Sequence, residues 1–176
     1  MKALAQIIDR INEYVGRTAI WLTLGLVVVQ FALVVLRYVF GFGSVWLQEL
    51  VIYMHGLLFL LAAGYTLLHD AHVRVDIFYR EASPRYQALV NLVGSVFLLI
   101  PVCILIGIES WPFVKLSWMV HEGSRETSGI PAVYLFKTAI PVFAVLLGLQ
   151  GLSLAIHSAR TLLGREIPIH ETAPKL

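Results

Sequence analysis

Two polar stretches of this sequence contain most of the side chains that could do chemistry, and the first is rich in metal-ligand types. Its members alternate with apolar residues: His69, Asp70, His72, Arg74 and Asp76. Imidazole and carboxylate groups bind metals, but two nearby imidazoles without a second ligand group seldom complete a four-ligand site. Asp70 and Arg74 are also spaced as an ion pair on a helix. We therefore interpret the stretch as a polar motif and not as a metal site.

The second polar stretch, residues 109–130, divides into an aromatic half and an acidic, hydroxyl-rich half. Aromatic side chains such as Trp111 and Trp118 are typical of a membrane–water interface. The other half holds polar residues that are free to touch a partner protein outside the membrane. We interpret these as docking candidates: Glu122, Ser124, Arg125 and Glu126.

Enzyme motifs are absent from the sequence. It contains no G-x-x-x-x-G-K phosphate loop and no H-E-x-x-H zinc motif. Cys103 is the only cysteine, so the chain can form neither an internal disulfide nor a multi-thiolate metal site. The net charge of +2 is too small to indicate a nucleic-acid partner. We expect no catalytic residue, metal or cofactor in this chain.

A haem site between histidines is the alternative that the sequence leaves open. On the expected helices, His55 and His157 differ in depth by about 15 Å at 1.5 Å rise per residue. His69 and His157 match better in depth, and paired histidines can hold haem. The alternative function is therefore a haem- or quinone-linked membrane anchor of a redox complex.

The elements that must position these residues are four uncharged stretches of membrane-spanning length: 18–36, 50–68, 88–108 and 138–156. About 20 helical residues cross the ~30 Å hydrocarbon core of a bilayer. Hydrophobic residues make up 59% of the chain and charged residues 14%, compared with roughly 25% charged residues in soluble domains. The sequence predicts an all-α integral membrane protein in which residues 1–176 form a single domain with four transmembrane helices.

Lysine and arginine are divided unevenly between the two sides of this domain. Nine lie before the first span, between the second and third spans, or after the fourth, and three lie on the other side: Arg37, Lys115 and Arg125. The positive-inside rule then predicts that both termini are cytoplasmic, with residues 157–176 as a cytoplasmic tail. The first span is longer than a signal-peptide core, so we expect it to remain as a helix.

Residues 1–17 are predicted to form a separate amphipathic helix. Apolar residues such as Ile8 and Ile11 recur at helical spacing, while Asp9, Asn12 and others occupy the opposite side. Such a helix lies in the cytoplasmic interface, with its apolar stripe in membrane lipid or against a partner helix.

The second span is predicted to pack closely against other helices. Gly56, Ala63 and Gly64 share one of its faces, and Gln48 and His55 lie on the adjacent face. Small residues let helices approach closely in a membrane, and polar residues seek hydrogen bonds between helices. We therefore expect this helix to be buried in protein.

Three charged residues lie near the outer ends of the spans: Arg37, Glu49 and Lys137. A charge at a helix centre costs ~2.5 to 3.5 kcal/mol on insertion scales, so pairing or snorkelling is expected. An ion pair within the protein and separate solvation at the interface both remain open, as does direct pairing of Glu49 with Lys137.

Prolines and one serine predict helix starts and bends. Ser83 can cap the third helix, and Pro84 then occupies a position where a missing N–H costs nothing. Pro101 and Pro141 lie inside the third and fourth spans, where each removes a backbone hydrogen bond. We expect both helices to bend there.

The order of these polar motifs resembles the small permease subunit of tripartite ATP-independent periplasmic (TRAP) transporters. The matching positions run through nearly the whole chain: Trp46, Gln48 and Glu49, the stretch 68–78, Ser83 and Pro84, Trp111 and Pro112, the stretch 122–124, the stretch 129–131, Lys137, Ile140 and Pro141, and Gln150. The run from His69 to Phe78 is the most specific of these.

The resemblance implies a multi-pass subunit of the bacterial inner membrane that associates with a large permease subunit. In that family the large subunit contains the transport path and the sodium sites. A periplasmic solute-binding protein delivers the solute, commonly an organic acid. The small subunit is expected to act as a scaffold for the large one, surrounded by membrane lipids. The sequence does not identify the solute.

Overall fold

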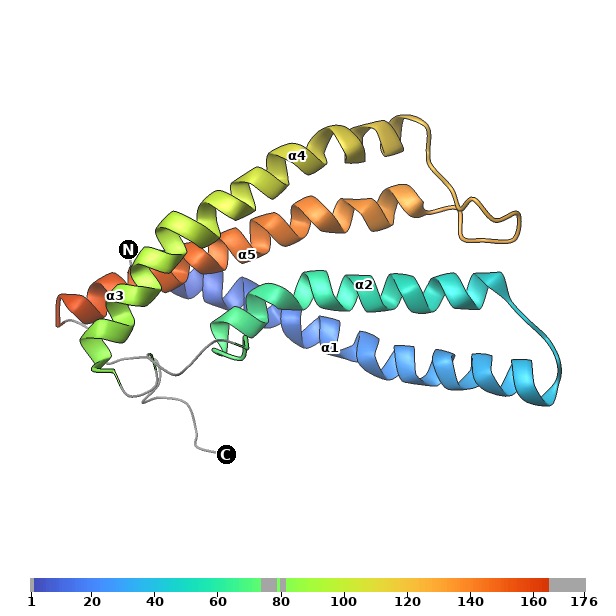
Figure 1. Ribbon diagram of the computed structural model, residues 1–176, viewed down its shortest axis with the longest axis horizontal. Coiled ribbons are helices and arrows are strands. Elements are labelled where there is room, and N and C mark those ends of the chain that lie inside the picture. Colours follow the sequence, from blue (N-terminus) through green and yellow to red (C-terminus); the bar gives the residue numbers. More distant parts are fainter. Residues whose placement is uncertain (1, 74–78, 80–81, 165–176) are drawn as a thin grey trace.

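The computed structural model describes residues 2–73, 79 and 82–164, and the elements in this part of the chain are all helices. In chain order they are α1 (Lys2–Val39), α2 (Val45–Leu68), α3 (Pro84–Gly94), the π-helical turn η1 (Ser95–Leu99), α4 (Ile100–Met119) and α5 (Val133–Leu162) (Figure 1). Because α3, η1 and α4 follow one another without a break, the described residues form four helical rods long and apolar enough to cross a membrane. The predicted all-α, four-span architecture is confirmed.

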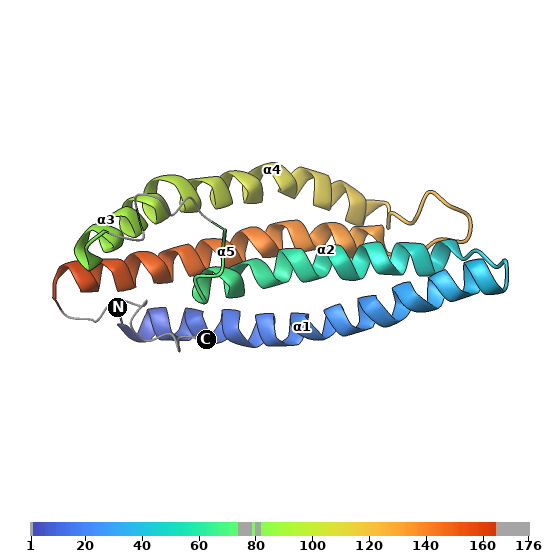
Figure 2. The ribbon, with the colours of Figure 1, turned by 60° about the horizontal axis from the view of Figure 1, so that its bottom comes forward.

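Helix α5 is the central rod. It contacts α1, α2, α3, η1 and α4, and α1 also packs along α2. Within the described residues α4 contacts neither α1 nor α2, and both views place it on the far side of α5 (Figures 1 and 2). In the most apolar window of each rod, 39% of the α5 residues are buried, compared with 6% to 11% in the others. The helices therefore form an open arrangement around α5.

The two ends of the molecule contain different connections. The short connection 40–44 and the longer loop 120–132 lie at one end, which we call the loop end (Figure 1). The start of α1, the end of α2, the start of α3 and the end of α5 lie toward the other, which we call the terminal end. The predicted docking residues belong to the loop end, and His69 to His72 belong to the terminal end.

Residues 2–17, expected as a separate element, continue into the first span as one helix. No proline or glycine pair interrupts this stretch, and the Thr18 hydroxyl donates a hydrogen bond of 3.1 Å to the Tyr14 carbonyl oxygen across the expected boundary. A helix of 38 residues is about 57 Å long, which exceeds the ~30 Å hydrocarbon core. Asn12, assigned by periodicity to the polar outer side, is 1% exposed. That assignment was wrong, because this side of α1 packs against α2 and α5.

The third rod begins and bends near the predicted residues. The backbone N–H of Tyr86 donates to the Ser83 hydroxyl, and Pro84 opens α3, so the predicted cap is confirmed. The π-helical turn ends two residues before Pro101, which has no backbone N–H to give to the regular ladder. Figure 2 shows α3 and α4 curving along α5. In contrast, α5 continues as an α-helix through Pro141.

Small residues of α2 allow close approach to helices of the same chain. A Cβ atom on Gly56 would lie 2.5 Å from the Phe136 ring of α5. A Cβ atom on Gly64 would overlap the Asn12 side chain of α1 and lie 3.3 Å from the Leu146 carbonyl oxygen of α5. The predicted close-packed face of α2 is therefore filled by α1 and α5.

The adjacent face of α2 differs from the expectation that this helix is buried in protein. Gln48 and His55 are both exposed, and Phe59 is 67% exposed. Since α4 lies beyond α5, no described helix of this chain covers these side chains.

Replacing Gly56 with leucine is expected to destabilise the fold by about 1–3 kcal/mol, because the added side chain overlaps the Phe136 ring. The matched control is Gly94→Leu, since a Cβ atom at Gly94 meets nothing within 4 Å. Both changes gain similar helix propensity. Unfolding in detergent measures the difference, and equal stability of the two variants would contradict the packing described.

Candidate functional site

At the loop end, the Glu49 carboxylate ties α2 to the loop 120–132. Glu49 lies just after the start of α2, which is capped by Ser44. Its Oε1 accepts a hydrogen bond from the Ser124 hydroxyl, and its Oε2 accepts one of 2.6 Å from the Ile130 backbone N–H. A Cβ atom on Gly129 would overlap Ser124 and lie 2.7 Å from the Glu49 carboxylate, so this close approach needs glycine. One carboxylate thus fixes both arms of the loop.

Lys137 makes an ion pair within the protein, but with a residue of the loop. Its Nζ lies 2.5 Å from Oε2 of Glu122 and 3.9 Å from the centroid of the Phe113 ring. Glu49 and Lys137 therefore take different partners, which answers the question that the sequence left open. Arg37 is exposed in the last turn of α1 and makes no ion pair with any residue that the structure describes.

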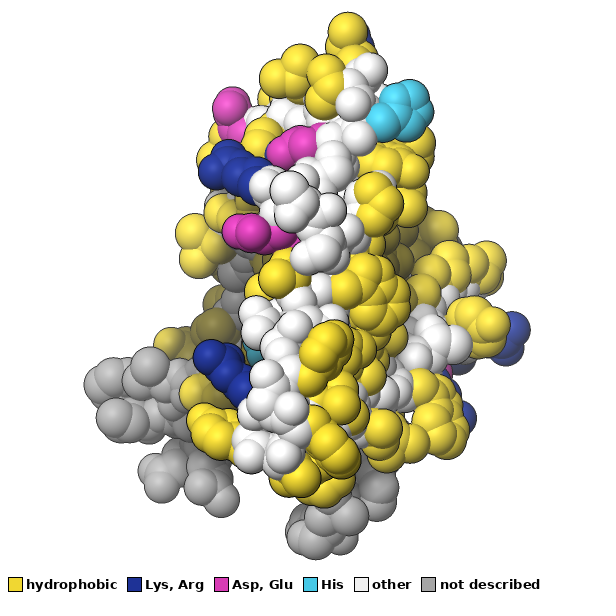
Figure 3. All heavy atoms as spheres, turned by 90° about the vertical axis from the view of Figure 1, so that its right-hand side faces the viewer, with side chains coloured by type: hydrophobic (Ala, Val, Ile, Leu, Met, Phe, Trp, Pro, Cys, Tyr) yellow, Lys and Arg dark blue, Asp and Glu magenta, His cyan; other side chains and the backbone are white. Residues whose placement is uncertain are grey.

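Two of the docking candidates bind other residues of this chain, and the other two are exposed. Glu122 and Ser124 point back to Lys137 and Glu49, while Arg125 and Glu126 are exposed. Trp46 and Gln48 are exposed on α2 at the same end. Figure 3 shows the loop end face on, with its acidic side chains gathered in the upper part. The loop end therefore presents several charged side chains on a loop that Glu49 and Lys137 hold in place.

The ion pair at the loop end depends on pH. The hydrogen bond from Lys137 lowers the pKa of the Glu122 carboxyl below its usual value of 4.5. A carboxyl group with a lowered folded-state pKa stabilises the fold above its unfolded pKa, and this contribution is lost as pH falls through the folded pKa.

We therefore expect the wild-type chain to lose more stability than a Glu122→Gln variant when pH is lowered from 7 to about 3. The variant lacks the carboxylate that pairs with Lys137, so lowering the pH cannot break an ion pair at this position. Thermal unfolding across this range measures the difference. Glu126→Gln, which changes an exposed glutamate of the same loop, should follow the wild type. Parallel pH profiles of the wild type and Glu122→Gln would contradict the stabilising ion pair.

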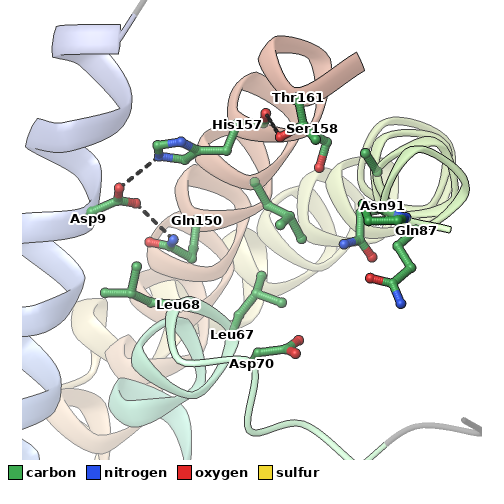
Figure 4. A pocket seen from close by; sticks show the side chains of 13 residues that line it. Asp9, Leu67, Leu68, Asp70, Gln87, Asn91, Gln150, His157, Ser158 and Thr161 are labelled. Carbon is green, nitrogen blue, oxygen red and sulfur yellow. Dashed lines mark hydrogen bonds and ion pairs between the residues drawn. The ribbon is translucent and has the colours of Figure 1, made fainter. Parts of the chain in front are cut away.

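At the terminal end, a hydrogen-bond network joins α1 to α5. The Asn12 amide donates to the Gln150 Oε1 at 2.9 Å, and the Gln150 amide donates to the Asp9 Oδ1 at 3.0 Å. The Ser153 hydroxyl donates to the same oxygen at 2.6 Å. The second oxygen of Asp9 lies 3.1 Å from Nε2 of His157 (Figure 4). Asp9 therefore gathers three side chains from successive turns of α5.

Sequence reasoning missed this network as a site. Asp9 and Asn12 were assigned to the outer side of an interfacial helix, although they lie between helices. A signal existed in α5, where Gln150, Ser153 and His157 recur at i, i+3 and i+7 in an otherwise apolar span. A polar stripe of this spacing indicates a polar partner on a neighbouring helix.

The first polar stretch is partly bound to α1 as well. His69 Nε2 lies 2.7 Å from the Glu13 carboxylate, and His72 Nε2 lies 3.2 Å from the Ala63 carbonyl oxygen. Arg74 and Asp76, the other members of the predicted motif, lie outside the described residues. Among the residues that the structure describes, no group of three or more histidine, cysteine and acidic side chains could hold a metal ion.

A cavity of about 210 Å³ opens beside this network, between α2, α3 and α5. Its polar lining includes Asp70, Gln87, Asn91, Ser158 and Thr161 (Figure 4). The space exceeds what one water molecule needs and offers several hydrogen-bonding groups, so it can admit water. Water can therefore reach the polar groups at this end of α5.

Removing the Asp9 carboxylate is expected to destabilise the fold by about 1–3 kcal/mol, because hydrogen-bond donors of α5 are left without their acceptor. The comparison is Asp9→Ala with Arg10→Ala, which changes an exposed residue of the same turn. Unfolding in detergent reports the stability of each variant. Equal destabilisation by the two changes would show that the network does not hold α1 to α5.

Four apolar rods of spanning length, with polar contacts gathered at their two ends, define a multi-pass membrane protein. Residues 26–161 match the family model described as "Tripartite ATP-independent periplasmic transporters, DctQ component". The match covers most of the chain, and the chain belongs to this family. A search of curated proteins gave no match.

The family is a transporter component family, which makes this chain a small TRAP transporter subunit, as the resemblance predicted. The match favours a transporter over a haem- or quinone-linked anchor. The α5 half of the terminal-end network lies inside the matched residues, whereas Asp9 and Asn12 precede them.

Proposed function

We propose that this chain is the scaffold subunit of a sodium-coupled TRAP transporter of the bacterial inner membrane. It braces a large permease subunit, which contains the transport path and the sodium sites. It also helps to dock a periplasmic solute-binding protein that delivers an organic acid or related solute. Both termini lie in the cytoplasm, in keeping with the nine-to-three distribution of lysine and arginine.

The bracing of α5 at both ends is the observation that carries this proposal. At the terminal end, the Asp9 network joins α5 to α1, and at the loop end Lys137 joins it to the loop. Transport sites in secondary transporters are built from discontinuous helices near the middle of the bilayer. In the described part of this chain the four rods are continuous, and the one departure is a single π-helical turn. These features suit a rigid support more than a moving transport path.

The loop end supports the docking role. The carboxylate of Glu49 holds the loop from below while Arg125 and Glu126 remain exposed. An ordered, charged loop needs little further ordering on binding, which lowers the cost of docking a partner. With the termini in the cytoplasm, this loop faces the periplasm and the binding protein.

Proteoliposomes that contain this chain alone are expected to show no sodium-dependent uptake of solute. Addition of the large permease subunit and the loaded binding protein should restore uptake, because the transport path belongs to the large subunit. The measurement is accumulation of labelled solute under an inward sodium gradient. Robust uptake by this chain alone would overturn the scaffold assignment.

Within the complete complex, Glu49→Ala should lower uptake by releasing the loop, since Ser124 and Ile130 lose their acceptor. Glu109→Ala, at an exposed glutamate of α4, is the control that should leave uptake unchanged. Equal uptake by the two variants would contradict the role assigned to the loop.

A further inference from the structure

One face of α2 leaves polar side chains without partners. Gln48, Ile52, His55 and Phe59 are all exposed, and they form what we call the α2 stripe. At 100° per residue these four positions fall within about 60° of the helix circumference. The stripe is therefore a narrow, continuous line along one side of the helix.

The other faces of α2 are occupied by this chain. Gly56 and Gly64 meet Phe136 and Asn12, and Tyr53 stacks on Phe136 with ring centroids 4.6 Å apart. The stripe is thus the side of α2 that α1 and α5 leave open.

Exposed apolar residues on a membrane helix do not indicate a protein partner, because lipid can cover them. His55 is different. It lies ten residues after the first residue of α2, or about 15 Å along the helix. That distance is near the middle of the ~30 Å hydrocarbon core, where no water is available.

Neither the His55 side chain nor the Gln48 side chain makes a hydrogen bond to any residue that the structure describes. The His55 ring instead lies against the Phe59 ring, with centroids 4.8 Å apart. Polar side chains within a bilayer almost always face protein or a water-filled cavity. The cavity at the terminal end is not lined by His55 or Gln48. A protein partner is what remains to satisfy His55 at that depth.

We infer that the α2 stripe is the surface that docks one transmembrane helix of the large permease subunit. This inference rests on the proposed function, which supplies a second membrane subunit. The docked helix presents a hydrogen-bonding side chain or a free backbone carbonyl opposite His55. It presents apolar or small residues opposite Ile52 and Phe59, so that the two helices approach closely.

Photo-crosslinking in the purified complex tests the position of this surface. A benzophenone amino acid replaces Ile52, which is 59% exposed, or Val28 of α1, which is 58% exposed. Gly25 of α1 faces Met54 of α2, so Val28 lies close to the depth of Ile52. The expected result is an adduct with the large subunit from position 52 and lipid adducts or none from position 28.

The affinity of the two subunits tests the hydrogen bond. His55→Leu should weaken their association by about threefold to fifteenfold, the range of one hydrogen bond between membrane helices. His55→Gln, which keeps a donor and an acceptor, should recover part of that loss. The control is Leu24→Ala, at an exposed apolar residue of α1, which should leave the affinity unchanged.

Several results would overturn the inference. They are adducts from position 52 with a second copy of this chain or with lipid alone, adducts with the large subunit from both positions, or equal affinities of the histidine variants and the wild type. In each case a complex that still transports leaves the proposed function standing. If the large subunit does not co-purify with the wild-type chain, the inference and the proposed function both fail.

Discussion

The arrangement of this protein depends on how α5 is held. All the other described helices contact α5, and polar contacts fix it at Lys137 near its start and at Gln150, Ser153 and His157 in its second half. Between those ends its packing relies on small residues, which add little hydrophobic driving force in lipid. The hydrogen bonds that Asp9 accepts from one half of α5 and the ion pair of Lys137 near its other end therefore help to determine where α5 lies.

This division of labour leaves two surfaces available to other molecules. At the loop end, Glu49 and Lys137 hold the loop through a hydrogen bond and an ion pair. The charged side chains of Arg125 and Glu126 remain exposed on its surface. Along α2, one face packs against other helices of this chain, while the stripe around His55 is exposed. A component of a multi-subunit transporter needs such surfaces, and here they project from a braced frame.

Local sequence signals predicted much of this fold because they act within one helix. The four spans, the Ser83 cap and the proximity of a backbone irregularity to Pro101 depend on neighbouring residues alone. The close-packed face of α2 was also predicted, because Gly56 and Gly64 have no side chain to keep a neighbouring helix away. The sequence misassigned Asn12, because periodicity separates two sides of a helix without saying which side meets another helix.

The sequence by itself determined the solvent, the number of spans and the residues whose burial in lipid would need compensation. The composition and the lengths of the uncharged stretches are sufficient for this, because the free-energy cost of placing a polar side chain in hydrocarbon depends on that residue itself. Tertiary structure alone decided the partners. Asn12 meets Gln150 across 138 positions, and Glu49 meets the Ile130 N–H across 81. Such pairings depend on which helices become neighbours, and no pattern within a single helix contains that information.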